Sequence, residues 1–574
     1  MASRLLPTLY AVSTAVAVII LGPLLRPGHL LYRDAVSTPR THLTDTTLGI
    51  DGLPPRAVPQ DWFVGVFSTV VDGGFALMAM LFAALVLAGV GYGRLAARLV
   101  PDAGRSGAAV AAIASVWNPF VAERLLQGHW GLLVGYASLG WIVLTLLDLR
   151  ERGGLAQWAQ LIAAVGLAGL TPSGSLLAGA LLLVVGVPML LRANTSRRLV
   201  TAAGGVLVWI VGALPWLVAS AIAGTAVSSS GSAGVRAFGL RAEPGLGGLG
   251  TALGLGGIWN NDAVPASRSM WWAAVATACL LLVVATGVVF LWSHRTTLDP
   301  TVTWLATLAA LTVALVAVAA TSPGMSALGW LIDTVPGAGL LRDTQKFLAL
   351  AVPFLVVATA AACTWARRWV PAGFAVGAAT LLIVAPLPDL AWGVGGRIAP
   401  VHYPDDWARI SAIITPDDGA VLLWPPGTLR RYDFADDPSL DPTPRMVRAA
   451  VLQSGELTVD GVLVDPPDPT TAAAEHILSN GGPASELAKL GVGWVLVENT
   501  ATDAPRPAGA QQVFDGKQLR LYRIPDADTA AISASTGERV AVWTANLVWL
   551  GAIGVGLVLG LRRSRRTDPG TRRR

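Results

Sequence analysis

Long apolar runs alternate with short polar segments over the first two thirds of the chain, and one further run lies near its end. Most of these runs approach about 20 residues with hardly any charge, which is the length that an α-helix needs to cross the hydrocarbon core of a bilayer. The pattern therefore predicts a polytopic α-helical membrane protein. The twelve predicted spans are residues 6–25, 72–93, 106–117, 131–148, 155–170, 174–192, 199–224, 270–293, 302–321, 345–365, 370–389 and 540–561.

The pattern changes between the last two predicted spans. Apolar runs there shorten to the length of β-strands, and turns rich in Pro, Gly and Asp separate them. The predicted strands are 420–424, 492–499 and 518–524, and helical apolar spacing marks 404–414 and 483–490. We therefore expect a membrane module of about 11 spans at 1–389, an extracytoplasmic α/β domain at 390–539, and a final span with a basic tail at 540–574.

Composition supports the membrane class. Of the 574 residues, 53% are hydrophobic and 13% are charged, and the mean hydropathy is +0.58. Soluble globular domains are about one quarter charged, so that class is excluded. Cys279 and Cys363 both fall inside predicted spans, which predicts neither a disulfide framework nor a Cys-based metal site.

The distribution of basic residues predicts the topology. Lys and Arg collect in the cytoplasmic loops of membrane proteins, and here they occupy every second loop and the C-terminal tail. The loop residues are Arg94, Arg98, Arg105, Arg150, Arg152, Arg192, Arg197, Arg198, Arg295, Arg367 and Arg368. We expect a multi-pass protein of the plasma membrane with both termini in the cytoplasm. The net charge of +5 follows from this topology and does not indicate a nucleic-acid partner.

The first predicted exterior loop contains candidate catalytic groups. Its stretch HLLYRDAVSTPR, residues 29–40, places Arg33 and Asp34 just after the first span, and Asp45 and Asp51 follow. A carboxylate there could take a proton from a hydroxyl, and a cation could stabilise a departing phosphate. The alternative is that Asp34 forms a surface ion pair with Arg33 or caps a helix.

The second exterior loop, WNPFVAERLLQGHW at 117–130, has more charge than a membrane anchor needs. Its two tryptophans fit an interfacial turn, which is the alternative reading. Glu123, Arg124 and His129 go beyond that role. Because adjacent residues of a helix do not face each other, Glu123 and Arg124 are expected to have separate partners.

A third candidate element is GLLRDTQKFLAL at 339–350. Arg342 and Lys346 are spaced i, i+4 at the start of a span, so we expect them on one helix face, where they could bind a phosphate near the headgroups. Snorkelling of both cations to lipid headgroups is the alternative. Asp343 would be their partner or a charge at the helix start.

The Gly-rich exterior loop 225–269 does not follow a strand of a βαβ unit, so it is not a dinucleotide site. It is either a plain connector or a cover for a substrate groove within reach of Arg241, Glu243 and Asp262. Asp72, at the start of the second span, is a second-rank catalytic candidate whose alternative is a helix N-terminal charge.

These motifs resemble those of the GT-C superfamily, the membrane glycosyltransferases that use polyprenyl-phosphate sugars. The acidic residue after the first span, the NPF-x-x-ERLL-x-G-x-W stretch, the R-x-x-x-KF element and the C-terminal LGVGWVLVEN and LRLYRIP segments are similar to those of actinobacterial arabinofuranosyl- and mannosyltransferases of the cell envelope. The resemblance implies that Asp34 is the catalytic or metal-linked residue. The first loop lacks an Asp-x-Asp pair, and no His, Asp or Glu spacing typical of a metal site appears, so no metal ligand is predicted and a divalent cofactor is left open.

The predicted activity is transfer of a sugar from a polyprenyl-phosphate donor to a glycan or glycolipid at the outer face of the membrane, among membrane lipids. The expected catalytic residues are Asp34, Glu123 and His129, and the expected substrate-binding residues are Arg33, Arg124, Arg342, Lys346, Asp343 and Glu243. Two alternatives remain. A transporter or flippase of lipid-linked precursors would show two similar halves with charges deep in the spans, and a non-catalytic envelope-assembly scaffold would tolerate substitution of exterior Arg or Asp residues.

Overall fold

The computed structural model describes residues 2–192, 198–223, 231–459, 461–498, 504–529 and 533–566. In this part of the chain, ten helical segments are long and apolar enough to cross a membrane. They are Arg4–Leu25, Gly73–Leu99, Pro101–Gln127, Trp130–Arg152, Pro172–Leu191, Ala202–Ala223, Trp272–Ser293, Thr301–Ala319, Thr344–Ala366 and Thr536–Gly560. The protein is therefore a multi-pass membrane protein.

The count of twelve predicted spans is not reproduced, and two segments account for the difference. The predicted span 155–170 is a helix of only 14 residues, α8 (Leu155–Ala168), which is too short for the hydrocarbon core. The predicted span 370–389 is a pair of helical segments, Ala372–Val384 and Pro388–Gly396, bent by 73°. Counting this bent pair as one span gives eleven.

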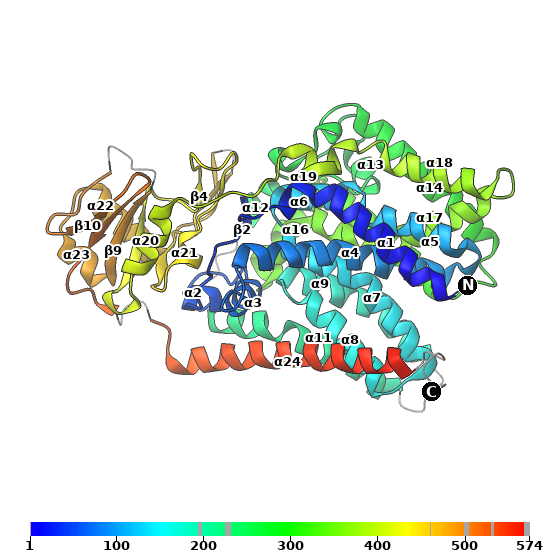
Figure 1. The fold of residues 1–574 in the computed structure, drawn as a ribbon, viewed down its shortest axis with the longest axis horizontal. Coiled ribbons are helices and arrows are strands. Elements are labelled where there is room, and N and C mark those ends of the chain that lie inside the picture. The colour runs from blue at the N-terminus through cyan, green and yellow to red at the C-terminus, as the bar shows by residue number, and fades with distance from the viewer. Residues whose placement is uncertain are drawn as a thin grey trace.

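The N-terminal two thirds of the chain is almost entirely helical (Figure 1). Its helices are α1 (Ala2–Leu21), α2 (Asp45–Leu48), α3 (Gln60–Phe67), α4 (Gly73–Leu99), α5 (Gly104–Val116), α6 (Pro119–Gln127), α7 (Trp130–Arg152), α8, α9 (Pro172–Leu181), α10 (Val187–Arg192), α11 (Arg198–Ala223), α12 (Gly231–Ala237), α13 (Gly247–Leu253), α14 (Trp272–Ser293), α15 (Thr301–Ala319), α16 (Ser322–Thr334), α17 (Val352–Ala366), α18 (Ala372–Val384) and α19 (Ala391–Gly396). The last helix, α24 (Thr536–Arg566), runs alongside α8 and α11.

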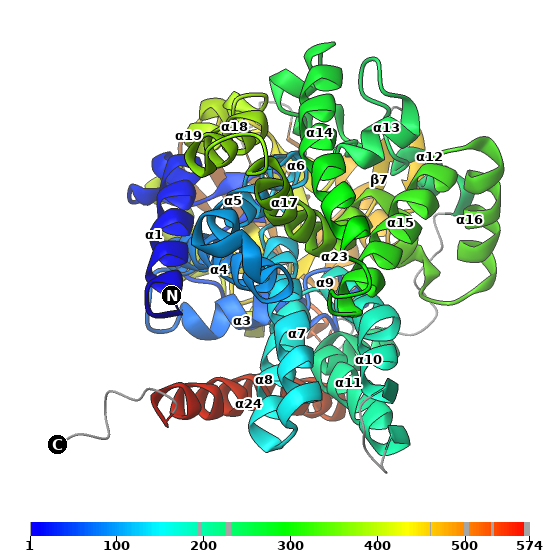
Figure 2. The same ribbon diagram turned by 90° about the vertical axis from the view of Figure 1, so that its right-hand side faces the viewer.

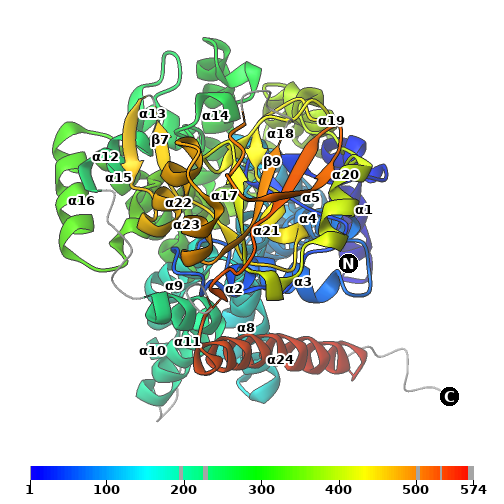
Figure 3. The ribbon, with the colours of Figure 1, turned by 90° about the vertical axis from the view of Figure 1, so that its left-hand side faces the viewer.

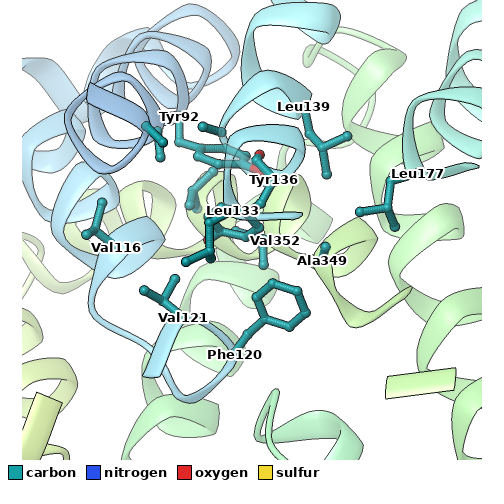
Figure 4. Packing of buried hydrophobic residues seen from close by; sticks show 14 of the residues in the cluster. Tyr92, Val116, Phe120, Val121, Leu133, Tyr136, Leu139, Leu177, Ala349 and Val352 are labelled. Carbon is teal, nitrogen blue, oxygen red and sulfur yellow. The ribbon is translucent and has the colours of Figure 1, made fainter. Parts of the chain in front are cut away.

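The helices α4, α5, α7 and α17 form the centre of the bundle, with α1 and α15 on opposite sides (Figure 2). Figure 4 shows buried residues of this centre together with Phe120 and Val121 of α6. The rings of Phe120 and Tyr136 stack with their centroids 5.4 Å apart, and the Tyr92 hydroxyl donates a 2.9 Å hydrogen bond to the Tyr136 carbonyl. Glycines allow close approach, since a Cβ on Gly135 would lie 2.9 Å from the Cα of Gly174 on α9. This rigid centre supports α6, which leads into the candidate site.

The C-terminal domain lies at one end of the bundle, and the start of α1 and the end of α24 lie at the opposite end (Figure 1). Its five-stranded sheet has the order β10-β11-β9-β3-β6, in which β3 pairs in parallel with β6 and β9, while β11 is antiparallel to β9 and to β10. The strands are β3 (Ala420–Trp424), β6 (Val451–Leu452), β9 (Val492–Glu498), β10 (Gln511–Asp515) and β11 (Leu519–Arg523). Three of them lie where the sequence predicts strands.

Helices cover both faces of this sheet (Figure 3). Side chains alternate along a strand, so Val421 and Leu423 pack with Trp407 of α20 (Asp405–Ile413), whereas Leu422 packs with Leu478 of α22 (Pro469–Ser479) and with α23 (Ala484–Lys489). The remaining elements are α21 (Thr443–Met446) and the hairpins β4 (Leu429–Arg430) with β5 (Ser439–Leu440) and β7 (Leu457–Val459) with β8 (Val462–Asp465).

Candidate functional site

The first loop forms a short hairpin, β1 (Leu31–Tyr32) and β2 (Ala35–Val36), with Arg33 and Asp34 at its turn. Arg33 has a left-handed backbone with φ 49°. The Arg33 amide donates to the Pro438 carbonyl at 2.9 Å, and its carbonyl accepts from the Leu440 amide at 2.8 Å. The turn is thus attached to the C-terminal domain on one side.

Helix α6 supports the other side of the turn, and its sequence fixes its ends. The Asn118 side chain caps the first turn by accepting a 3.0 Å hydrogen bond from the Val121 amide, with Pro119 in the first helical position. Gly128 ends the helix in the left-handed region, at φ 83°. The Asp34 amide then donates to the Gln127 carbonyl at 3.2 Å. This contact sets the position of Asp34 relative to the bundle.

Arg33 and Asp34 do not form an ion pair with each other, because the turn sends their side chains apart. One guanidinium nitrogen of Arg33 lies 3.1 Å from the Asp262 carbonyl and 3.5 Å from the Asp437 carboxylate. The Asp34 carboxylate instead lies 2.9 Å from Nε2 of His129. The structure therefore excludes the surface-pair reading of Asp34.

The hydrogen bonds of His129 define its tautomer. Its Nδ1 lies 2.9 Å from a guanidinium nitrogen of Arg124, which can only donate. Nδ1 must therefore be the acceptor, and Nε2 carries the hydrogen that is donated to Oδ2 of Asp34. Arg124 thus holds His129 as a neutral donor directed at Asp34.

Behind His129, Arg124 is fully buried and forms a two-point ion pair with Asp343, at 2.8 and 3.2 Å, and it also donates to Gln345. Burial alone would raise the pKa of Asp343, but the charge and hydrogen bonds of Arg124, together with Lys346, lower it to about 2. Asp343 is therefore a carboxylate at any working pH. The chain from Asp34 through His129 and Arg124 to Asp343 is held by charge-assisted hydrogen bonds.

Asp34 is the accessible end of this chain. Its side chain is 37% exposed and that of His129 is 24% exposed, whereas Arg124 is enclosed. Only Oδ2 of Asp34 is engaged, by His129 and, at 3.4 Å, by Gln127. Oδ1 accepts no hydrogen bond from any residue that the structure describes. One oriented carboxylate oxygen is thus left for a substrate.

Glu123 has a different role from the predicted catalytic one. Its buried carboxylate accepts 3.0 Å hydrogen bonds from the amides of Gly257 and Ile258 and from the side chain of Gln345. A carboxylate enclosed in this way does not contact a substrate. Glu123 instead fixes the Gly-rich loop to α6. The prediction that Glu123 and Arg124 have separate partners holds only in part, because Asp343 binds Arg124 alone whereas Gln345 bonds to both.

Glu243 is likewise not available to a substrate. It is buried against Arg268, whose Nε donates to it at 2.9 Å, and a second guanidinium nitrogen also donates. Burial raises the pKa of Glu243 despite this pair. The predicted substrate contact of Glu243 is therefore replaced by a structural role in the 225–269 loop.

The RDTQKF element also differs from the predicted α-helix. Residues Thr344–Ala351 form a 3₁₀ segment, and Arg342 and Asp343 precede it, so Arg342 and Lys346 do not share an α-helical face. Arg342 donates to Asp465 of the C-terminal domain at 2.9 Å, and Arg56 donates to the same carboxylate at 2.8 Å. Lys346 is buried and makes no hydrogen bond to the described residues.

The other candidate carboxylates lie outside this cluster. Asp72 caps α4 through a 3.1 Å hydrogen bond from the Phe75 amide and lies 3.2 Å from His29. Asp45 pairs with Arg539 of α24. Among the described residues, no group of three or more His, Cys, Asp or Glu side chains is placed to hold a metal ion.

Sequence reasoning missed three members of the site. Gln345 stands within a motif that the sequence singles out, between Asp343 and Lys346, and its position next to them was the available signal. Arg56 and Asp465 lie 409 residues apart, and neither is part of a recognisable motif. Only the folded chain brings them to Arg342.

Comparison with solved structures identifies the fold class. The structure of arabinofuranosyltransferase AftD from Mycobacteria matches with a TM-score of 0.55 and 16% identity, over 92% of this chain and 40% of the AftD chain. A mutant of AftD matches with a TM-score of 0.53 and 15% identity, over 91% of this chain and 42% of that chain. ArnT from Cupriavidus metallidurans, solved with undecaprenyl phosphate, gives a TM-score of 0.35 at 13% identity, over 93% of this chain and 100% of that chain.

This chain thus spans about two fifths of the length of AftD. No protein-family model matches the sequence, and no curated protein matches it. The fold of this chain is nevertheless similar to that of arabinofuranosyltransferase AftD.

Proposed function

We propose that this protein is a membrane glycosyltransferase that transfers a sugar of the arabinofuranose or mannose class from a polyprenyl-phosphate donor to a glycan or glycolipid of the cell envelope. One observation carries the proposal: the half-exposed Asp34 is oriented by His129 through Oδ2, while Oδ1 accepts no hydrogen bond from the described residues. The fold shared with AftD supports the same class of reaction.

In this reaction Asp34 is the general base. Oδ1 accepts a hydrogen bond from the acceptor hydroxyl and takes its proton as the hydroxyl oxygen attacks the anomeric carbon of the donor sugar. The bond between that carbon and the phosphate oxygen breaks, and polyprenyl phosphate leaves with the electron pair. His129 keeps the carboxylate oriented, and Arg124 keeps His129 in the required tautomer.

The donor phosphate would be bound by the cations next to Asp343. Lys346 is the first candidate, because its ammonium lies beside this cluster and makes no hydrogen bond to the described residues. Arg342 and Arg56 are the second pair, and both now bind the Asp465 carboxylate. A phosphate could replace that carboxylate with similar bidentate geometry.

The proposed site faces the exterior, and both termini are cytoplasmic. The basic loops and tail support this topology through the positive-inside rule. The placement of the C-terminal domain at one end of the bundle, and of the start of α1 and the end of α24 at the other, agrees with it. The lipid tail of the donor would then lie among the spans, with its phosphate near Lys346.

The test is sugar transfer by membranes that contain the protein. Labelled arabinofuranose and mannose would be offered separately as polyprenyl-phosphate donors, and mannose also as a water-soluble nucleotide sugar. The proposal predicts transfer from one lipid donor and none from the nucleotide sugar. It also predicts that Lys346→Met raises the donor KM at least about tenfold, which is the loss of affinity expected when a charge-assisted hydrogen bond is removed.

A second lysine variant controls for the loss of a positive charge. Lys489→Met alters the last turn of α23, in the C-terminal domain, and should leave the donor KM unchanged. Transfer from the nucleotide sugar alone, or no transfer from either lipid donor, would contradict the proposal.

A further inference from the structure

A cavity of about 360 Å³ lies where the first loop, the segment after α19 and the C-terminal domain meet. It is lined by Leu31 and Tyr32 of β1, by Arg397 and residues 399–402, and by Phe434, Asp436 and Asp437. The volume is at the lower end of the range for small-molecule sites. None of the donor-binding candidates lines it.

Backbone hydrogen bonds hold these walls in place. His29 and Val401 exchange two bonds of 2.8 Å, which fix the segment after α19 to the hairpin. On the other side, the Arg33 amide binds the Pro438 carbonyl at 2.9 Å. Arg33 and Arg397 both donate to the Asp262 carbonyl, so one side of the cavity is also fixed to the Gly-rich loop. The segments that line the cavity are therefore held in fixed positions relative to one another.

The lining combines donors, acceptors and an aromatic ring. Asp436 and Asp437 supply carboxylate oxygens, Arg397 supplies guanidinium donors, and Phe434 supplies a half-buried ring that stacks on Tyr432 at 5.2 Å. Carboxylates oppose a purely anionic ligand, and Arg397 opposes a purely cationic one. A neutral ligand with many hydroxyl groups satisfies both kinds of group.

One buried group points to a ligand independently. The Tyr32 side chain lines the cavity, the residue is only 4% exposed, and its hydroxyl has no hydrogen-bond acceptor among the described residues. The side chain of Arg33 can donate to the oxygen of this hydroxyl, so the group that lacks a partner is the hydroxyl proton. A buried hydroxyl proton without an acceptor costs free energy unless a ligand or water supplies one.

We propose that this cavity is a saccharide-binding subsite, in which one or two sugar units of the acceptor are bound by the carboxylates, Arg397, the Phe434 ring and the Tyr32 hydroxyl. The proposal rests on the proposed function, because the subsite lies one hairpin turn from Asp34. The sugars bound here would belong to the acceptor, and the donor would occupy the opposite side of the turn, toward Lys346.

The experiment measures binding and transfer on the full-length protein in lipid nanodiscs. Binding of an oligoarabinofuranoside and of an oligomannoside, without donor, would be followed by saturation-transfer NMR for the wild type and for Phe434→Leu and Asp436→Asn. Phe434→Leu keeps an apolar side chain but removes the ring, and Asp436 is exposed, so both variants should fold. The control is Asp417→Asn, an exposed aspartate elsewhere in the same domain.

The inference predicts that each cavity variant weakens binding of one of the two saccharides about tenfold, which corresponds to about 1.4 kcal/mol. The acceptor KM should rise by the same factor while the donor KM stays constant. Asp417→Asn should change neither quantity. The inference would be overturned if Phe434→Leu and Asp436→Asn bound both saccharides as tightly as the wild type, or if the wild type bound neither saccharide.

The two proposals fail separately. If the protein binds a saccharide in the cavity but transfers no sugar from either lipid donor, the subsite stands and the proposed function is wrong. If transfer occurs and both cavity variants keep the wild-type acceptor KM, the function stands and the subsite is wrong.

Discussion

At the scale of single residues, the site depends on a buried charge that is compensated. Arg124 is enclosed in the bundle, and Asp343 is its ionic partner. Removing one partner of a buried pair leaves an uncompensated charge, which costs about 3–5 kcal/mol. Because Arg124 also fixes the tautomer of His129, loss of its ionic partner is expected to disturb the orientation of Asp34 as well.

Asp343→Asn should therefore lower both stability and kcat. We expect the unfolding free energy to fall by about 3 kcal/mol and kcat to fall at least about tenfold, measured by thermal unfolding and by transfer at saturating donor. The control is Asp299→Asn, because Asp299 also forms a two-point pair with an arginine, Arg150, at 2.5 and 3.1 Å, although this pair is partly exposed. This control should lose stability but keep kcat per folded molecule, and an equal loss of kcat in both variants would contradict the assigned role.

At the scale of elements, the contact between α6 and the β1–β2 hairpin sets the position of Asp34. Gly128, at the end of α6, allows the close approach: an added Cβ would lie 2.3 Å from the Ala35 amide nitrogen and 2.8 Å from the Tyr32 carbonyl oxygen. Both are backbone atoms of the hairpin, so the turn would have to move away from α6.

Gly128→Ala should accordingly reduce transfer more than it reduces folding. The control is Gly337→Ala, since Gly337 has nearly the same φ, 84° against 83°, but nothing lies within 4 Å of its added Cβ. Both variants bear the backbone strain of a left-handed alanine, about 1 kcal/mol. Only Gly128→Ala should lower kcat, and equal activities of the two variants would count against the positioning role of α6.

The end of strand β9 provides a second prediction at this scale. Burial, together with the nearby Asp441, raises the pKa of Glu498 to about 8, even though Arg430 donates a 2.7 Å hydrogen bond to it. The folded domain thus favours the uncharged form of Glu498. Its contribution to the stability of the domain is complete below the ordinary pKa of 4.5 and is lost as the pH rises through about 8.

The unfolding temperature of the C-terminal domain should therefore fall as the pH rises from about 5 to about 8. These two values lie close to the ordinary pKa of a glutamate and to the raised pKa of Glu498. Glu498→Gln should flatten this dependence, which scanning fluorimetry at several pH values would measure. Glu486→Gln, at an exposed position of α23, should keep the wild-type slope. A steep slope that persists in Glu498→Gln would show that another group is responsible.

At the scale of the whole molecule, the C-terminal domain is bonded to the bundle next to the site. The hairpin turn binds it through Arg33, and Asp465 at the end of β8 binds Arg342 and Arg56 of the bundle. Asp465 thus binds Arg342 and Arg56, the two cations that the proposed function assigns to the donor phosphate. Domain attachment and donor binding would compete for the same guanidinium groups.

Asp465→Asn should consequently lower the donor KM several-fold, because a neutral amide competes less well with phosphate for two guanidinium groups. Initial rates at varied donor concentration would measure this. The control is Asp418→Asn, which breaks a pair with Arg523 inside the C-terminal domain and should leave the donor KM unchanged. A donor KM that rises in Asp465→Asn would show that the contact supports donor binding instead.

Sequence patterns predicted the parts of this molecule that local physics determines. Apolar length and charge identified most spans, and alternation of apolar residues located β3, β9 and β11. The motifs also marked Asp34, Arg124, His129 and Asp343, which the fold brings into one chain of contacts.

Burial and long-range pairing could not be predicted in this way. Glu123 and Glu243 are acidic residues in candidate loops, yet both are buried. The partners of Glu123 lie 134 or more residues away, and the partner of Glu243 is Arg268, 25 residues further along the chain. The partners of Arg33 and Arg342 lie in the C-terminal domain, and no pattern within one segment reports on such contacts.

The central claim is that Asp34 is the general base. The most direct measurement compares transfer from the lipid donor by wild type, Asp34→Asn and Asp72→Asn. Asp72 is the matched control because it is also an aspartate next to a histidine, His29, and because asparagine can still cap α4. We predict that Asp34→Asn lowers kcat at least about a hundredfold at wild-type stability, while Asp72→Asn keeps the wild-type kcat. Substantial transfer by Asp34→Asn, or an equal loss in both variants, would contradict the account.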